Sequence, residues 1–452
     1  MTKYNIDETD INSYLGNGFL CSCGRTHSVE IERVIIENGA IKRLPELLNA
    51  FGFKKIFIVA DDNTYKVAGI QVEEVLTRNA AVFRTHIYHR QYDLVPDESA
   101  AGEFIINMER DTDVILAIGS GVINDLCKYM SYKLGIPYII VATAPSMDGY
   151  ASNGSALILE NLKTTLSAVV PKAIIGDIDV LKNAPMKMIT AGFGDMIGKY
   201  SAINDWQLGN IINDEYYCPK IADMVMSSVK KCIESAEGLK ERRDDAIKNL
   251  MEGLVITGIA MSFAGNSRPA SGSEHHLSHF VEMMYLFDEK DAPLHGAKVG
   301  VNTLIVNRMR RLLAADVPDI QEIQKRAGLF DEKKWAEEIK RIFRQAAPGI
   351  IRLNEKEKIN DSNERMKRVH RIIEKWETIS KVLKDTPSNE EIAASLTKAG
   401  APVSPEELGI SWDLIEEGIV YAKEVRARYT VLQLAWDIGV LDKLAAEIKA
   451  GR

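Results

Sequence analysis

Short continuous runs of apolar residues alternate with helix-like patterns over the first 180 residues of the chain. Such runs are typical of strands in a parallel sheet, because these strands are buried on both faces. The expected strands are residues 55–60, 82–88, 113–118 and 138–142, and the expected helices among them are residues 97–110 and 122–134. This alternation predicts an α/β domain whose helices cover both faces of a parallel sheet.

The pattern changes after residue 151. Three β-rich pieces could form a small antiparallel insertion closing the sheet: residues 156–159, 164–170 and 173–175. After Asp177 the strand signal disappears and helical patterns follow, the first opening at Pro219, a residue that suits the first position of a helix. They cover residues 219–238, 242–261, 319–327, 333–346, 355–382 and 414–444. We therefore expect an α/β domain over residues 1–180, with an N-terminal extension, and an all-α domain over residues 181–452.

The composition agrees with two soluble domains. The chain has 452 residues, of which 46% are hydrophobic and 27% charged, and single cores stop growing at roughly 250–300 residues. A net charge of −8 and a pI near 5.7 argue against nucleic acid or an anionic membrane as the main partner. No apolar run approaches the roughly 20 residues that span a bilayer, and the first residues lack the apolar segment of a signal peptide.

The cysteines favour a cytoplasmic protein. There are five, an odd number in a long chain, and they do not make a disulfide framework. Cys21-Ser-Cys23-Gly-Arg-Thr-His27 resembles half of a zinc site, but no second half follows, because the next cysteine is Cys127. A turn with reduced thiols is the favoured interpretation of this segment.

Three separated segments could form one metal site: Gly192-Phe-Gly-Asp195, Gly272-Ser-Glu-His275-His276-Leu-Ser-His279 and Pro293-Leu-His295-Gly296. One carboxylate and two imidazoles leave positions for water or substrate, as at a catalytic rather than a structural metal. His275 and His279 are four residues apart, so on a helix they share a face, where one could bind metal and the other could face the substrate. The alternative is that these histidines are structural or exposed, which is the usual role of a histidine taken alone.

A second candidate site follows the strand at residues 113–118. Strand, Gly119-Ser-Gly121 and helix together present backbone N–H groups to an anion such as a pyrophosphate. The motif differs from GxGxxG, since position 124 is Asn and the loop follows the third strand, so a plain turn is the alternative. Asp61, at the end of an earlier strand, could accept from an adenosine ribose and would favour NAD over NADP, or it could be a turn residue.

The loop after the fourth strand, Thr143-Ala-Pro-Ser146-Met-Asp148-Gly-Tyr-Ala-Ser152, is rich in hydroxyl groups. Loops at the carboxyl ends of parallel strands are where α/β proteins bind ligands. Asp148 could hold a substrate hydroxyl or cap a turn through its side chain.

These motifs, together with Ser267-Arg-Pro-Ala-Ser-Gly-Ser-Glu274 and the segment at residues 422–434, resemble the sn-glycerol-1-phosphate dehydrogenase family. The likeness runs in matching order from about residue 25 to the C-terminus and is closest to the bacterial branch. This family belongs to the iron-containing alcohol dehydrogenase and glycerol dehydrogenase superfamily. The resemblance implies a dehydroquinate synthase-like fold, with a Rossmann-like NAD(P)-binding domain followed by a helical domain for metal and substrate.

The resemblance also implies roles for individual residues. Asp195, His275 and His295 would bind the metal; His279 and Asp148 would act at the substrate, which Asp195 also borders; and Asp61 would meet the adenosine ribose. The pyrophosphate would lie against Gly119, Ser120, Gly121, Val122, Ile123, Asn124 and Asp125, and the nicotinamide side against Thr143, Ala144, Pro145, Ser146 and Ser152.

Three positions depart from the pattern or complicate it. Val122 stands where relatives commonly have Thr, which removes one possible cofactor hydroxyl. Lys199 stands where the wider alcohol dehydrogenase group often has a fourth, histidine ligand, and its presence fits the three-ligand branch. His276 leaves open which imidazole faces the metal, although the spacing to His279 favours His275.

The expected reaction is reversible reduction of dihydroxyacetone phosphate to sn-glycerol 1-phosphate by NAD(P)H, with the metal as Lewis acid on the C2 oxygen. His279 is the expected proton relay, because an unperturbed imidazole pKa of about 6.5 is near working pH. Arg268 could grip the substrate phosphate, with Lys199 as second candidate, or it could be a surface arginine at a helix end. The resemblance points to Zn or Ni more than to Fe, to phospholipid precursor synthesis and to a dimer.

Three alternatives stay open. A glycerol dehydrogenase-type enzyme would prefer the unphosphorylated ketone. A dehydroquinate synthase-like enzyme shares the fold, NAD and metal, but its first ligand is typically Glu, so Asp195 speaks against it. A non-catalytic NAD-binding homologue would have lost a ligand, and none is lost here.

Overall fold

The computed structural model describes residues 10–91, 93–159, 162–315, 323 and 330–451. The chain forms two compact units, each made of more than one stretch of sequence. The first unit comprises the chain up to Met196 together with Lys220–Ser267, and the second comprises Ile197–Pro219 together with Arg268–Arg452. Among the described residues no strand follows Asp177, close to the predicted division at residue 180, while the two units divide the chain differently.

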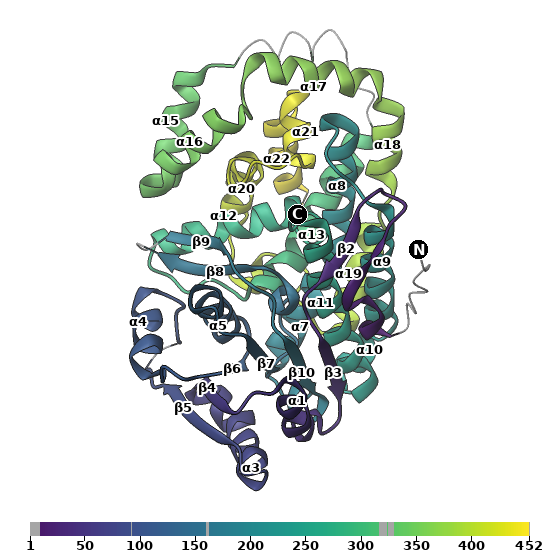
Figure 1. Cartoon of the computed structure of the whole chain (residues 1–452). Coiled ribbons are helices and arrows are strands. Elements are labelled where there is room, and N and C mark those ends of the chain that lie inside the picture. The colour runs from purple at the N-terminus through teal and green to yellow at the C-terminus, as the bar shows by residue number, and fades with distance from the viewer. Residues whose placement is uncertain (1–9, 92, 160–161, 316–322, 324–329, 452) are drawn as a thin grey trace. The chain divides into compact units, whose positions relative to one another are not determined.

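A six-stranded parallel sheet in the order β3-β10-β7-β6-β4-β5 is the centre of the first unit (Figure 1). The predicted parallel sheet is therefore confirmed, and its fully buried central strands explain the continuous apolar runs. The strands are β3 (Arg33–Glu37), β4 (Lys55–Asp61), β5 (Val82–Tyr88), β6 (Val114–Gly119), β7 (Tyr138–Ala142) and β10 (Ala173–Asp177).

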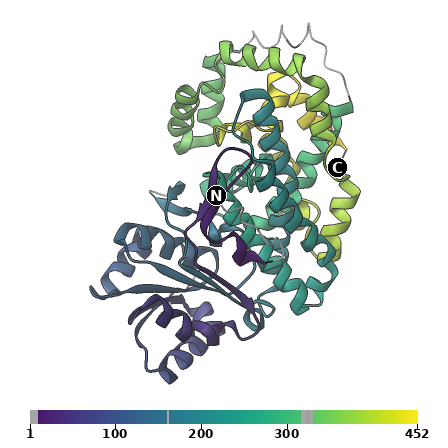
Figure 2. The same cartoon turned by 45° about the vertical axis from the view of Figure 1, so that its right-hand side comes forward.

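Helices cover both faces of this sheet, as Figures 1 and 2 show. On one face α1 (Leu44–Phe51) and α3 (Ile70–Arg78) pack against alternate residues of the strands in one apolar cluster. On the other face α4 (Glu98–Asn107) and α5 (Gly121–Leu134) cover the intervening residues, and Phe57 of β4 meets Phe104 of α4 with ring centroids 5.2 Å apart. Each large apolar side chain buried in this way contributes about 1.5–3 kcal/mol.

The three β-rich pieces after residue 151 do not form one insertion. β8 (Gly154–Leu159) and β9 (Leu162–Ser167) form a separate antiparallel hairpin. The third piece is β10, which lies inside the main sheet, parallel to β3 and β7. That part of the prediction was wrong, because a short buried apolar strand carries no sign of its pairing partner.

The rest of the first unit consists of an N-terminal hairpin and further helices. The hairpin strands β1 (Gly16–Leu20) and β2 (Thr26–Val29) follow a 3-10 helix, η1 (Ile11–Tyr14). The helices are α6 (Ile178–Leu181), α7 (Met186–Ile197), α9 (Pro219–Glu234), α10 (Ala236–Lys240) and α11 (Asp244–Ala264). By length and composition α11 alone among the described helices could cross a membrane, but 78% of its most apolar stretch is buried in the protein, where it packs against β2 and β3. It is a core helix.

The described residues of the second unit form helices and no strands. Its core gathers apolar side chains from most of these helices, with Phe280 and Leu277 of α12 at 0% exposure. The helices are α8 (Lys199–Asn213), α12 (Ser273–Phe287), α13 (His295–Ala315), α15 (Glu332–Phe343), α16 (Ala347–Glu357), α17 (Ser362–Glu374), α18 (Trp376–Lys384), α19 (Asn389–Ala399), α20 (Trp412–Tyr421), α21 (Val431–Asp437) and α22 (Leu441–Ala450).

Two long predicted helices are in fact divided. Residues 355–382 contain the end of α16, then α17 and α18, because the Asp361 side chain accepts from the backbone N–H groups of Asn363 and Glu364 and so starts a new helix. Residues 414–444 contain parts of α20, α21 and α22, and Gly439, with φ +76°, follows the end of α21. The helix predicted at residues 319–327 lies outside the described residues.

Candidate active site

The carboxyl ends of β4, β6 and β7 form one edge of the sheet in the first unit. Asp61 ends β4 and Gly119 ends β6, while the N–H of Thr143, just after β7, donates to the Gly119 carbonyl at 3.1 Å. The chain continues from β4 to β5 on one side, whereas β6 lies on the other side of β4. In open α/β sheets ligands bind in the crevice at such a switch point. The predicted cofactor residues 61, 119–121 and 143 thus share one edge.

The two glycines of the loop after β6, Gly119 and Gly121, have different surroundings. A Cβ at Gly119 would lie 2.6 Å from the Ile123 Cβ, so this glycine lets the strand turn closely into α5. A Cβ at Gly121 would meet nothing nearer than the Met147 Cγ at 4.0 Å. The first turn of α5 holds no acidic residue, and the first N–H groups of any helix lack partners within it. This helix start can therefore receive an anion.

Asp61 caps the helix that follows it. Its Oδ1 accepts from the N–H groups of Asn63 at 2.9 Å and Thr64 at 2.8 Å, and the Thr64 hydroxyl accepts from the Asp61 N–H. The turn interpretation of Asp61 is therefore confirmed. The ribose interpretation stays a prediction. The Asp61 Oδ2, which does not take part in the cap, would accept the hydrogen bond from the ribose hydroxyl.

A buried lysine that the sequence analysis did not single out organises the loop after β7. The Lys128 Nζ donates to the carbonyls of Gly149 at 2.6 Å and Gly154 at 3.0 Å, and to the Ser152 hydroxyl at 3.2 Å. It also lies 3.3 Å from the Asp125 Oδ1. Burial lowers the pKa of Lys128, while the Asp125 charge opposes that shift. The lysine therefore clamps the loop to α5.

Several predicted cofactor residues serve this clamp. The Asn124 amide donates to the Gly149 carbonyl at 3.4 Å, and Asp125 accepts from the Ala156 N–H at 3.3 Å. The Ser152 hydroxyl donates to the carbonyls of Gly149 and Gly154. The structure gives these three side chains contacts within the protein, and their contacts with a cofactor stay predictions.

Asp195 lies on α7 in the same unit, and the glycine before it explains the motif. A Cβ at Gly192 would come within 1.9 Å of the Pro145 carbonyl oxygen, so only glycine lets α7 pack directly on the loop after β7. One turn further along, the buried Asp195 carboxylate accepts from the Asp148 N–H at 3.0 Å. The structure thus brings together two predicted site residues, Asp148 and Asp195.

Three imidazoles come together in the second unit. His275 and His279 lie one turn apart on α12, and His295 is the first residue of α13. The His295 ring centroid is 5.1 Å from that of His275 and 5.4 Å from that of His279. His276 is absent from this group of rings, although it is fully buried. His275 is therefore the imidazole that lies with His295.

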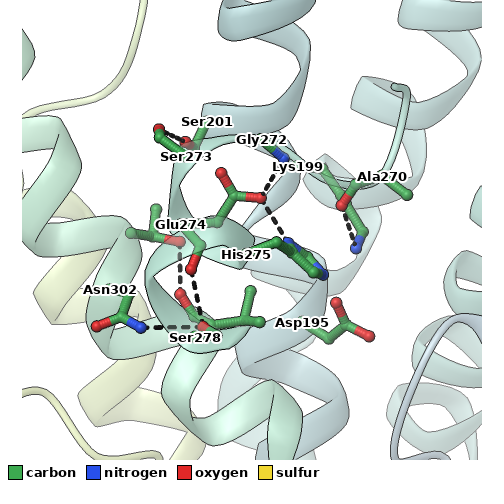
Figure 3. Close-up of polar contacts among 12 residues, drawn as sticks. Asp195, Lys199, Ser201, Ala270, Gly272, Ser273, Glu274, His275, Ser278 and Asn302 are labelled. Atoms are coloured by element: carbon green, nitrogen blue, oxygen red, sulfur yellow. Dashed lines mark hydrogen bonds and ion pairs between the residues drawn. The ribbon is translucent and has the colours of Figure 1, made fainter. Parts of the chain in front are cut away.

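Carboxylates orient all three rings. The Glu274 Oε1 lies 2.6 Å from the His275 Nδ1 (Figure 3). The Glu282 carboxylate serves the other two rings, with Oε1 2.8 Å from the His295 Nδ1 and Oε2 3.1 Å from the His279 Nδ1. A carboxylate at one ring nitrogen fixes the tautomer and directs the other nitrogen to a metal or substrate. Glu282 could have been found from the sequence, because it lies three residues after His279 and seven after His275.

The electrostatics of His279 differ from the expectation. Burial and the nearby Arg426 charge lower the pKa of His279 well below its usual value, although Glu282 opposes the shift. The expectation of an unperturbed pKa is therefore not met for His279. The Nδ1 of this ring lies 3.1 Å from the Glu282 Oε2.

Arg268 is buried, so the surface interpretation of this residue is wrong. Its Nη1 donates to the Tyr429 carbonyl at 2.7 Å, and its Nη2 donates to Glu215 at 2.5 Å. Lys199, the second phosphate candidate, is also buried and donates to the Ala270 carbonyl at 3.1 Å (Figure 3). Both cations have partners within the second unit.

Two further arginines of this unit were not singled out from the sequence. Burial and the neighbouring charges of Arg426 and Arg268 lower the pKa of Arg428 to about 9. Its Nη1 is buried without a hydrogen-bond partner. The charge of Arg426 also contributes to the lowered pKa of His276 and His279. Both arginines lie in the segment between α20 and α21, where the pattern Arg-x-Arg was the available signal.

Comparison with known proteins shows the family to which the chain belongs. Residues 35–185 match the sequence profile of the family described as iron-containing alcohol dehydrogenase. The chain is 33% identical over 415 residues to a protein from Halalkalibacterium halodurans named glycerol-1-phosphate dehydrogenase, NAD(P)+, covering 91% of this chain and 94% of that one. A protein of the same name from Geobacillus stearothermophilus is 33% identical over 417 residues, with 91% and 94% covered. One from Pyrococcus horikoshii is 35% identical over 271 residues, covering 60% and 73%.

Solved structures support the fold. The iron-containing alcohol dehydrogenase from Thermococcus thioreducens superimposes with a TM-score of 0.62 at 13% identity, covering 94% of this chain and 100% of that one. The glycerol dehydrogenase from Schizosaccharomyces pombe gives a TM-score of 0.56 at 15% identity, covering 93% and 91%. The predicted α/β-plus-helical architecture is therefore confirmed.

Proposed function

Because the chain belongs to the glycerol-1-phosphate dehydrogenase family, we propose that it reversibly reduces dihydroxyacetone phosphate to sn-glycerol 1-phosphate with NAD(P)H. The observation that carries the proposal is the group of three imidazoles, each oriented by a carboxylate. A dehydrogenase acting on a CH–OH group needs such donors for a metal and a proton acceptor near the alcohol.

We assign Asp195, His275 and His295 as ligands of one divalent cation. The donor types fit Zn or Ni, with Fe(II) a weaker match, and the Nδ1 contacts of both histidines direct Nε2 toward a metal. When bound, the cation supplies Lewis-acid polarisation of the C2 oxygen, and the nicotinamide carries the hydride. Asp195 additionally accepts from the Asp148 N–H, and this proximity supports our assignment of Asp148 as a substrate contact.

His279 acts on the proton. In the direction of alcohol oxidation its Nε2 accepts the proton of the substrate hydroxyl, while Nδ1–H donates to Glu282. The Glu282 carboxylate then stabilises the imidazolium that forms, because a negative charge at hydrogen-bond distance favours the charged ring. In the reverse direction the same imidazolium returns the proton.

The substrate phosphate is held by Arg426 and Arg428, with Arg268 supporting them. A buried guanidinium nitrogen without a hydrogen-bond partner is costly, and the Arg428 Nη1 is such an atom, so a phosphate oxygen that accepts from it would offset that cost. Arg268 already grips Glu215 and the Tyr429 carbonyl, so its role is to position the segment around Tyr429. Lys199 stays a second candidate for a contact with the substrate phosphate.

The cofactor lies along the sheet edge of the first unit, with its pyrophosphate at residues 119–125 and the adenosine ribose at Asp61. The nicotinamide side meets Thr143, Ala144, Pro145, Ser146 and Ser152. We also expect a cytoplasmic protein that supplies a phospholipid precursor. We expect it to be a dimer, which a measurement of its molar mass by light scattering tests.

The decisive experiment measures NADH oxidation by metal-stripped protein reloaded with Zn, Ni or Fe, on dihydroxyacetone phosphate and on dihydroxyacetone. Metal-dependent turnover with a strong preference for the phosphate is expected. Preference for the unphosphorylated ketone would indicate a glycerol dehydrogenase instead. Absence of turnover with every metal would contradict the dehydrogenase proposal and favour the dehydroquinate synthase-like enzyme or the non-catalytic NAD-binding homologue.

Replacing the arginines tests the phosphate assignment separately. Arg428→Ala should raise KM for dihydroxyacetone phosphate at least about tenfold, the effect of one lost charge-assisted contact, and leave the weak activity on dihydroxyacetone unchanged. The matched control is Arg352→Ala, which removes an exposed arginine of α16. Equal losses on both ketones would contradict the assignment.

A further inference from the structure

The N-terminal hairpin carries a group of metal-binding side chains that the proposed reaction does not use. Cys21 follows β1, Cys23 lies in the turn and His27 belongs to β2. The ligand atoms of these three residues all lie within 4.8 Å of one another. Cys21 and His27 are buried, with 7% and 1% of their surfaces exposed. We propose that this hairpin binds a structural zinc ion.

The turn has the geometry that brings both thiols to one place. The Cys21 N–H donates to the Arg25 carbonyl at 2.9 Å, and the Gly24 N–H donates to the Cys21 carbonyl at 3.0 Å. Gly24 has φ +84°, a left-handed conformation that favours glycine and closes the turn. The two cysteines therefore lie on a tight, hydrogen-bonded loop, as the thiolate ligands of structural zinc sites commonly do.

The contacts of His27 fix its tautomer. Its Nδ1 lies 3.1 Å from the Phe263 carbonyl oxygen of α11, an acceptor that requires a proton on Nδ1. The Nε2 then carries the lone pair and lies 3.3 Å from the Cys23 Sγ. In a tetrahedral site with Zn–S of about 2.3 Å and Zn–N of about 2.0–2.1 Å, neighbouring S and N atoms are about 3.6 Å apart. Histidine zinc ligands typically hold a carbonyl or carboxylate at the other nitrogen.

Two thiols and one imidazole of the first unit supply three of the four positions around a tetrahedral zinc ion. The other two cysteines of this unit have different surroundings. Cys127 lies on α5, and the Cys232 Sγ contacts the Asn249 carbonyl at 3.5 Å. Cys21, Cys23 and His27 are therefore the ligands that the hairpin itself provides.

The ion would stabilise the hairpin against α11. β2 packs on that helix, and Phe19, His27 and Phe263 meet with ring centroids 5.4–5.7 Å apart. A two-stranded hairpin has little stability of its own. Zinc binding would add to it, because metal bound only by the folded state stabilises that state. The site is separate from the catalytic cation, whose proposed ligands include no thiolate.

A thiol-specific mercurial distinguishes the two metals. Added to zinc-loaded full-length protein in the presence of a colorimetric zinc indicator, it displaces zinc from thiolates only, since soft sulfur ligands prefer mercury. We expect the wild type to release one zinc ion per chain. Cys21→Ser/Cys23→Ser should release none, and the matched control Cys232→Ser should behave as the wild type. Retained release from Cys21→Ser/Cys23→Ser would overturn the assignment of these two thiols.

Cobalt loading provides a second readout that does not depend on the variants. Wild-type protein loaded with Co(II) should show a thiolate-to-cobalt charge-transfer absorption, which an oxygen and nitrogen site cannot produce. If wild-type protein shows neither this absorption nor mercurial-dependent zinc release, the cluster is a set of hydrogen-bonded thiols and the proposal is overturned. Neither readout involves NADH, so failure of the proposed reaction would be seen separately.

Discussion

At the sheet edge of the first unit, the proposed cofactor site is built from backbone: two glycines, a helix start and a loop clamped by Lys128. On α12 and α13 of the second unit, it is built from side chains: three imidazoles whose Nδ1 atoms meet Glu274 and Glu282. The first region tolerates side-chain changes that keep the backbone in place, whereas the second depends on each donor and on the carboxylate behind it. Substitutions in the first region should therefore affect mainly stability, and substitutions in the second should affect mainly metal affinity.

The largest expected effect is on stability in the first unit. Lys128→Met keeps an unbranched side chain one atom shorter but leaves the Gly149 and Gly154 carbonyls and Asp125 without the ammonium. We expect a loss of about 3 kcal/mol in the free energy of unfolding, the usual cost of breaking a buried pair, measured by urea denaturation. Lys133→Met, exposed on the same helix, is the control. Similar stability of the two variants would show that the clamp contributes nothing.

The next effect is on metal affinity in the second unit. Glu282→Gln removes the charge that meets both His279 and His295 while keeping the shape of the side chain. Loss of such a carboxylate typically costs about 10–100-fold in metal affinity or activity, which titration of the stripped enzyme measures. Glu289→Gln, exposed just beyond the same helix, is the control. An unchanged metal affinity would mean that Glu282 does not orient a metal ligand.

The difference between the regions also explains what the sequence could predict. The strands at residues 55–60 and 138–142 were evident because burial on both faces leaves a nearly unbroken apolar run. The metal donors were evident as residue types in motifs, but Glu282 and Lys128 are charged residues on helices, a position that usually means exposure. Only tertiary packing buries Lys128 and leaves the Glu282 side chain 9% exposed.

The two glycines of the cofactor loop sharpen the comparison within the first unit. Gly119→Ala should destabilise the fold by about 1–3 kcal/mol, because the added Cβ meets Ile123 at 2.6 Å. Gly121→Ala meets nothing nearer than 4.0 Å and should leave stability within about 0.5 kcal/mol. It should nevertheless weaken NADH binding about tenfold, because a Cβ there intrudes on the pyrophosphate. Fluorescence titration with NADH and thermal unfolding separate the two effects; unchanged NADH affinity in Gly121→Ala would place the pyrophosphate elsewhere.

The smallest effect is expected at Asp61, where capping and ribose recognition overlap. Asp61→Asn retains a side-chain oxygen for the N–H groups of Asn63 and Thr64, so stability should change by less than about 0.5 kcal/mol, whereas Asp61→Ala should lose about 1 kcal/mol with the cap. If the carboxylate also faces the ribose, both variants should shift the ratio of kcat/KM for NADH and NADPH toward NADPH by a few-fold, because a 2′-phosphate no longer meets like charge. A cofactor preference that stays constant while stability falls only in Asp61→Ala would restrict Asp61 to the cap. The contact with the ribose would then have to come from backbone groups, as we propose for the pyrophosphate at the same edge of the sheet.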